Sequence, residues 1–350
     1  MSKKCYLLTL NKNLNIESIR ELLKEDYSFV PKAFSGYTNT NEYKNINKWH
    51  SLSETSILNE KVKYFRAEAT MEVTRSSKFF YENSTLIPKE IRVNRINISA
   101  IFLEIKISKD ICNIYSIIES SDTQLKDIRT HLFGTKQELS DSGFKEKWGI
   151  SSKNIYLNFT EDFFLWILLK KEKKENYLDN IVIMDINYLD DKHEDQNREH
   201  KTSGDDILSD LLSSVALTLE PKLLSLGILA ETKFGRFNFI LREDSSVILK
   251  DTNSFLKKDD LIIPITQENK YEFYLFIYGY LLPNLIDEFH QKKSELGKFK
   301  DEKSIFLRIQ GKKSFLRLAN FLGYTDKVFN YEDIEEIKVV IKEKNEVKVE

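Results

Sequence analysis

The sequence predicts an α+β fold made of two mixed halves, in which mainly antiparallel sheets are flanked by helices. Both halves contain short β-branched or aromatic runs between polar turns, which are typical of strands. Both also contain longer amphipathic stretches, which favour helices. The two kinds of element do not alternate regularly, as they would in a doubly wound parallel sheet.

The length of the chain, 350 residues, predicts two domains because a single hydrophobic core rarely grows that large. The composition, 41% apolar and 31% charged, is that of a folded globular protein. Residues 189–204 contain almost no apolar side chain, so we expect an acidic, mobile connector there. The expected domains are therefore 1–188 and 205–350.

The first domain is expected to begin with a strand over 5–10 and a helix over 16–23 that Asn15 caps. Its clearest strand covers 96–107, where apolar side chains alternate with polar ones. A turn can return this strand antiparallel over 111–118. Further elements are expected as strands around 64–65, 79–81 and 91–93 and a helix over 123–133 that Gly134 ends.

The same patterns predict the elements from residue 160 onward. They are a helix over 163–169 that Thr160 caps, a strand over 181–186, helices over 205–217 and 221–226, a hairpin of 237–241 with 247–249, a helix over 271–296 kinked at Pro283, a strand over 304–309, a helix over 313–322 and an edge strand over 337–349.

The two cysteines, Cys5 and Cys112, lie in apolar β-like runs and predict buried thiols in a reducing cytoplasm. Their separation leaves no zinc-binding pattern. The N-terminus lacks the apolar run of an export signal. The longest uncharged stretch, 273–286, has 14 residues, whereas a membrane-spanning helix needs about 20. We therefore expect no membrane partner.

The sharpest chemical signal is the run Phe102-Leu-Glu104-Ile-Lys106. A Glu-x-Lys on the polar face of an apolar strand resembles half of the metal-dependent nuclease motif of the PD-(D/E)xK superfamily. The resemblance implies that Glu104 binds a divalent cation and that Lys106 positions the attacking water or the scissile phosphate. The family also has an upstream Asp. Residues 64–104 contain none, which leaves Glu90 as a substitute.

The alternative interpretation of Glu104 and Lys106 is an exposed strand face with a cross-strand ion pair. The common nucleotide-binding, metalloprotease and hydrolase fingerprints are absent from the sequence. The connector offers five potential metal ligands, but nothing apolar would hold them rigid, so a solvated connector is favoured. These ligands are His193, Glu194, Asp195, Glu199 and His200.

Two segments, 61–109 and 288–327, are basic, with ten Lys or Arg against five Asp or Glu in each. Their cations could contact phosphates and their aromatic residues could stack on bases. The expected helix starting near Lys313 would add its positive dipole end beside Gly311; a solvated helix face is the alternative. The candidate nucleic-acid-binding residues are Lys312, Lys313, Arg317, Arg308, Arg75 and Lys78.

These patterns predict a non-catalytic binding protein that contacts nucleic acid or a nucleoprotein partner. The abundance of Lys, Ile and Asn is typical of AT-rich genomes and points to an accessory component of a microbial or mobile-element system, such as antiviral defence. One alternative is a Mg²⁺-dependent nuclease built on Glu104, Lys106 and Glu90. Another is a protein-protein interaction or regulatory module without nucleic acid. No cofactor is expected unless the chain is a nuclease.

Overall fold

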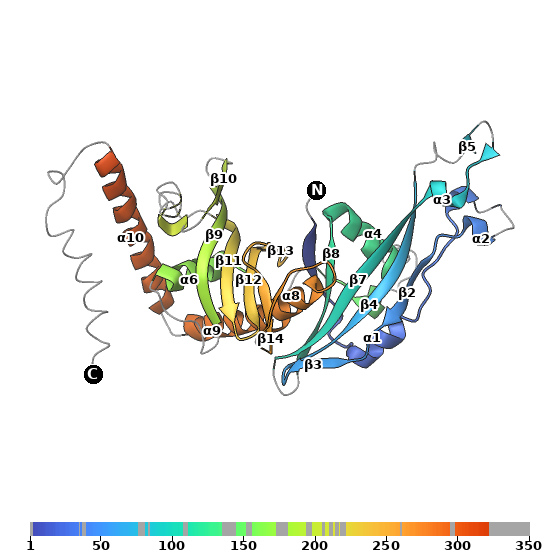
Figure 1. Ribbon diagram of the computed structural model, residues 1–350, viewed down its shortest axis with the longest axis horizontal. Helices are drawn as coiled ribbons and strands as arrows, with labels where there is room; N and C mark the ends of the chain where they lie inside the picture. The colour runs from blue at the N-terminus through green and yellow to red at the C-terminus, as the bar shows by residue number, and fades with distance from the viewer. Residues whose placement is uncertain are drawn as a thin grey trace. The chain divides into compact units, whose positions relative to one another are not determined.

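The computed structural model of this chain describes residues 3–34, 36, 40–75, 81–82, 85–107, 111–134, 145–151, 156–172, 181–193, 198–204, 207–209, 213, 217, 222–259, 261–294 and 298–321. These residues have the α+β fold expected from the sequence, with antiparallel strands and flanking helices (Figure 1). The chain forms two compact units. Unit 1 consists of Met1–Asn158 and Asp244–Asn284, and unit 2 of Phe159–Glu243 and Leu285–Glu350.

This division differs from the expected one, because each unit combines two separate stretches of the chain. The expected connector, 189–204, contributes to two paired strands, β9 (Ile181–His193) and β10 (Arg198–Ser203). Their antiparallel register runs from Arg198 opposite His193 to Ser203 opposite Tyr188. Backbone hydrogen bonds make this pairing, so it does not need the apolar side chains whose absence suggested a connector.

The main sheet of unit 1 is antiparallel and has the strand order β13-β1-β8-β7-β4-β2, with β3 also paired to β4. Its longest pair, β4 with β7, is in register from Val62 opposite Ile105 to Thr74 opposite Val93. These strands are β1 (Lys4–Thr9), β2 (Asn47–Leu52), β3 (Ser56–Asn59), β4 (Val62–Thr74), β7 (Val93–Lys106), β8 (Cys112–Ser120) and β13 (Val247–Leu249). A hairpin of β14 (Phe255–Lys258) and β15 (Leu261–Pro264) belongs to the same unit.

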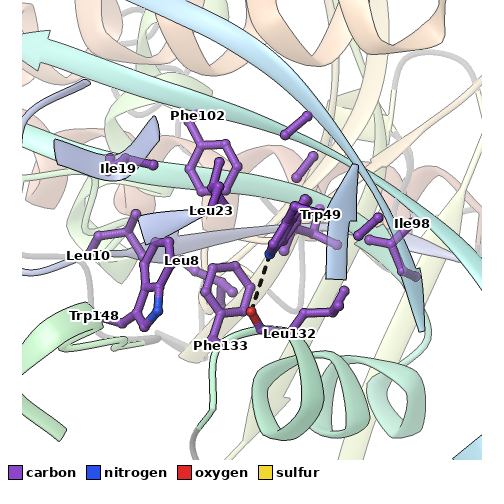
Figure 2. Close-up of a cluster of buried hydrophobic side chains, with 14 of the residues drawn as sticks. Leu8, Leu10, Ile19, Leu23, Trp49, Ile98, Phe102, Leu132, Phe133 and Trp148 are labelled. Carbon is purple, nitrogen blue, oxygen red and sulfur yellow. Dashed lines mark hydrogen bonds between the residues drawn. The ribbon is translucent and has the colours of Figure 1, made fainter. Parts of the chain in front are cut away.

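One face of this sheet packs against α1 (Ile16–Leu22), α4 (Asp122–Leu132) and α5 (Lys145–Trp148) around a buried aromatic cluster (Figure 2). The rings of Phe65 and Phe102 stack with centroids 5.1 Å apart. Trp148 meets Phe133 edge to face at 4.9 Å. The Trp49 indole N–H donates to the Leu132 carbonyl, 3.2 Å away, so its polar atom is satisfied inside the core.

The opposite face of the sheet is covered by α8 (Lys270–Phe276) and a π-helical turn, η5 (Ile277–Leu281). Gly279 in this turn lies so close to β3 and β4 that a Cβ there would sit 2.9 Å from Leu58 Cδ2. The buried Tyr278 hydroxyl lies 3.0 Å from the carbonyl of Cys5 and 2.7 Å from that of Ser245. Unit 1 therefore buries both faces of the central part of its sheet.

The far end of β4 and β7 carries α2 (Thr40–Tyr43), α3 (Lys89–Arg92) and a small two-stranded sheet, β5 (Tyr81–Glu82) with β6 (Thr85–Leu86). A 3-10 turn, η1 (Lys32–Phe34), lies nearby, because the buried Arg92 guanidinium stacks over Phe34 at 4.9 Å. Arg92 also pairs with Glu42 at 2.6 Å, which gives its buried charge a partner.

Unit 2 has a sheet with the strand order β10-β9-β11-β12, where β11 is Lys222–Thr232 and β12 is Gly235–Arg242. Its helices are α6 (Glu161–Glu172), most of α9 (Leu282–Ser294) and α10 (Lys298–Phe321). Eight consecutive residues of α6 are buried, as expected for a helix that is apolar all round. Asp162 in the first turn of α6 binds Lys293 of α9 at 3.0 Å and Lys303 of α10 at 3.3 Å.

Several sequence predictions of elements are confirmed. These are the strands expected over 5–10, 96–107, 111–118, 181–186, 237–241 and 247–249 and the helices expected over 16–23, 123–133 and 163–169. The expected helix over 271–296 is divided into α8, the π-helical turn and α9, and the change of helix type comes before Pro283 rather than at it. The predicted strand over 337–349 and most of the helix over 205–217 lie outside the described residues.

Three predictions were wrong. Residues 91–92, expected in a strand around 91–93, end helix α3, and strand β7 begins only at Val93. Residues 222–226, expected as part of a helix, belong to strand β11 because Leu226, Ile228 and Ala230 alternate into the core. Residues 304–322 were expected as a strand followed by a helix, but 298–321 form the single helix α10. Its buried Leu307, Gln310 and Ser314 follow the spacing of a helix face. In the described parts of the chain, no helix is long and apolar enough to cross a membrane.

Candidate anion-binding surface

Three lysines lie next to one another at one end of the unit 1 sheet. Lys61 directly precedes β4, Lys63 is its second residue, and Lys106 is the last residue of β7. The Lys106 backbone N–H donates to the Lys61 carbonyl at 2.8 Å, so these two residues are opposite each other. Their Cβ atoms are therefore about 5 Å apart, and Lys63 is a diagonal neighbour of Lys106 at about 7–8 Å. We call Lys61, Lys63 and Lys106 the lysine surface.

The local sequence accounts for this placement. Asn59 Oδ1 accepts the Lys61 N–H at 2.9 Å, an Asx turn that closes the hairpin of β3 and β4. Val62 and Ile105 are opposite each other and each is only 2% exposed. Because side chains alternate along a strand, burial of this apolar pair turns the neighbouring lysines to the other face, where all three are exposed.

The electrostatic environment of the lysine surface favours an anion. Lys63 and Lys106 make no hydrogen bond or ion pair with their side chains in the part of the chain that the structure describes. An anion bound there would give these two ammonium groups a partner of opposite charge.

A fourth cation, Arg20 of α1, borders this surface. Its guanidinium lies 5.0 Å from the ring centroid of Phe65, and Phe65 is two residues from Lys63 on the same face of β4. Arg20 also donates to the Ser53 carbonyl at 2.6 Å. These contacts hold the positive charge of Arg20 beside the lysines.

Two carboxylates lie at the same end of the sheet. Glu104 is opposite Lys63, and its Oε2 accepts the backbone N–H of Ile16 at 3.1 Å. Ile16 begins α1, so the Glu104 carboxylate lies at the positive end of that helix dipole. Glu60 is exposed in the turn. The acid between the lysines is thus already bound to a helix N-terminus.

The predicted nuclease residues are not brought together. Glu90 lies in α3, before the first residue of β7, whereas Glu104 is eleven residues beyond that residue, Val93. At the rise of a strand this separation is about 36 Å, and two ligands of one metal ion lie only a few ångströms apart. Glu72 is engaged by Lys89 at 2.9 Å. Among the described residues, no group of three His, Cys, Asp or Glu could hold a metal ion.

The C-terminal candidates occupy a different local structure from the expected one. Lys312, Lys313 and Arg317 lie in the second half of α10, which begins at Lys298. The positive dipole end of the helix is therefore about three and a half turns away from Gly311. Lys313 forms an ion pair with Glu172 of α6. Arg308 is on the same helix and is exposed.

The remaining candidate nucleic-acid-binding residues, Arg75 and Lys78, belong to the basic segment 61–109. Arg75 follows β4, is exposed, and donates its backbone N–H to the Arg92 carbonyl at 2.9 Å. Lys78 and residues 194–197 of the acidic segment lie outside the described residues. The expected stacking of aromatic residues on bases does not apply to Phe65, which is fully buried.

Sequence reasoning named Lys106 but missed its neighbours Lys61 and Lys63. The sequence predicted the strand over 96–107, but it did not show that β4 pairs with this strand. The three lysines could therefore not be placed together. The available signal was the alternation Lys61-Val-Lys63 beside a strand ending in Ile-Lys106. No protein-family model matches this chain, and no curated protein matches it significantly.

Proposed function

We propose that this chain binds nucleic acid through its phosphate backbone at the lysine surface of unit 1. It would act as a non-catalytic accessory protein of a microbial system, in a reducing cytoplasm. The observation that carries this proposal is the close placement of Lys61, Lys63 and Lys106 on two paired strands. Their spacing of about 5 to 8 Å lets all three reach neighbouring phosphates with their long side chains.

The arrangement of acids supports binding rather than cleavage. Hydrolysis assisted by a metal needs at least two ligands near the phosphate, and Glu104 is held by the N-terminus of α1 while Glu90 lies far away along β7. Lysine ammonium groups form point-charge contacts with phosphates without reading bases. The proposed binding is therefore governed by backbone charge and depends strongly on salt.

The proposal can be tested by replacing Lys61, Lys63 and Lys106 together with Gln. Binding of fluorescent DNA and RNA oligonucleotides is measured at several salt concentrations. We expect weaker binding for every sequence, and a slope of log affinity against log salt that is shallower by about two to three. Far-ultraviolet circular dichroism checks that the fold is retained, which is expected because all three side chains are exposed.

A matched control removes the same charge from α10 of unit 2. Lys312, Lys313 and Arg317 are replaced together with Gln, which changes the net charge of the chain by the same amount. We expect this variant to keep the affinity and the salt slope of the unmodified chain. An equal loss in both variants would mean that only net charge matters, and an unchanged unit 1 variant would exclude the lysine surface.

A further inference from the structure

An isoleucine projects into solvent beside the lysine surface. Ile57 of β3 is 71% exposed, the largest value among the big apolar side chains in the described parts of the chain. It is directly opposite Lys63 in the antiparallel pair of β3 with β4. Cross-strand partners share a face, so Ile57 and Lys63 emerge side by side, with Cβ atoms about 5 Å apart.

The position of Ile57 is imposed by the surrounding strand. The pairing of β3 with β4 shifts register between Ile57 and Asn59, and the intervening Leu58 turns toward Gly279 of the helical layer. Leu58 therefore faces the helical layer, and Ile57 is left on the outer face. Exposing the apolar surface of Ile57 to water is unfavourable. The lysine surface therefore has an apolar border that backbone phosphates alone would not contact.

This combination distinguishes between two forms of nucleic acid. In a duplex the base faces are stacked and hidden, and only phosphates and groove edges are presented. In a single strand the bases are unstacked, so a base face is free to contact a protruding side chain while cations follow the backbone. Lysines next to a protruding isoleucine therefore match a single strand better than a duplex.

We infer that the lysine surface takes single-stranded nucleic acid, with Lys61, Lys63 and Lys106 on the phosphates and Ile57 against an exposed base face. This inference rests on the proposed function. A negatively charged lipid surface also combines charge with apolar depth, but membrane binding grows with the apolar area that is buried. One isoleucine among three lysines provides little such area.

The test compares a short fluorescent oligonucleotide as a single strand with the same strand annealed to its complement. For the unmodified chain we expect tighter binding of the single strand. Ile57→Ser should weaken single-strand binding by about three- to tenfold, the effect of losing part of one buried isoleucine contact. Duplex binding and the salt slope should not change, because the lysines remain.

The control is Ile91→Ser, which removes a 53% exposed isoleucine from α3, at the opposite end of β7. We expect it to leave both affinities unchanged. Equal binding of single strand and duplex, or equal effects of the two isoleucine variants, would overturn this inference while leaving the proposed function intact. Binding of neither nucleic acid, together with Ile57-dependent sedimentation with anionic lipid vesicles, would overturn both.

Discussion

Glu104 shows how one residue can have the right chemistry for a site and still serve another purpose. The sequence indicates an acid two residues before a lysine on a strand face, and β7 confirms that geometry. The structure adds a partner that no local pattern reveals, the N–H of Ile16, which lies 88 residues away in the sequence. The Glu104 carboxylate stabilises the start of α1 through a hydrogen bond and through the helix dipole.

We predict that Glu104→Ala lowers the free energy of unfolding by about 1 to 2 kcal/mol, because Ile16 loses its acceptor and α1 loses a favourable charge. Glu104→Gln keeps a hydrogen-bond acceptor and should recover about half of that loss. Urea unfolding followed by circular dichroism measures both values. Loss of a Mg²⁺-dependent cleavage activity in a stably folded Glu104→Ala variant would contradict this structural role.

At the scale of elements, the sequence predicts helix or strand most reliably where the hydrophobic pattern extends over many consecutive residues. The strand over 96–107 and the apolar helix over 163–169 are found where expected. The prediction of a strand over 304–309 was wrong because a short apolar run with β-branched residues is compatible with a helix as well as with a strand. The lysine surface needed the register of β4 against β7, which depends on contacts between distant residues and is not a local property.

The helix α8 is attached to the unit 1 sheet by buried tyrosines. The Tyr274 hydroxyl donates to Glu119 of β8 at 3.2 Å, and Lys270 forms an ion pair with the same carboxylate. Burial, and then the charge of Glu119, raises the pKa of Tyr271 to about 12. Burial also raises the pKa of Tyr115 in β8 to about 12. Both hydroxyl groups therefore stay protonated in the folded unit until the pH approaches about 12.

These pKa shifts predict a loss of stability in alkali. The unfolded chain releases each tyrosine proton at the ordinary pKa of about 10, and the folded chain only near 12. The stabilisation is complete below pH of about 10 and is lost as the pH rises toward 12, by on the order of 2 kcal/mol for each tyrosine. Urea unfolding at a series of alkaline pH values tests this. The Tyr271→Phe variant should lose less unfolding free energy between pH of about 10 and 12 than the unmodified chain. An identical pH dependence would show that Tyr271 does not contribute to the alkaline loss of stability.

At the scale of the whole chain, the sequence predicted two α+β parts but placed their limits elsewhere. The sequence predicted a domain boundary at residues 189–204, where apolar side chains are scarce. The chain instead passes from one unit to the other after residues 158, 243 and 284. Nothing in composition marks those positions. They follow from which strands pair, since β13 at Val247–Leu249 completes a sheet that begins with β1.

The two divisions predict different behaviour for a fragment of residues 1–188. If the limits expected from the sequence applied, this fragment would be a complete domain. In the structure it lacks β13, α8 and the π-helical turn of unit 1. The Cys5 carbonyl would lose the hydroxyl of Tyr278, and the sheet face beneath α8 would be exposed to water, which is unfavourable. We therefore expect the fragment to lack a cooperative unfolding transition.

The matched comparison is a shortened chain that keeps only unit 1, with Met1–Asn158 joined to Asp244–Asn284 through a flexible linker in place of residues 159–243. This version retains β13 and α8, so it should unfold cooperatively in urea where the 1–188 fragment does not. It also carries the whole lysine surface and Ile57, and we expect it to bind single-stranded nucleic acid without unit 2. Cooperative unfolding of the 1–188 fragment with the same midpoint would show that the second stretch of unit 1 contributes nothing to its stability.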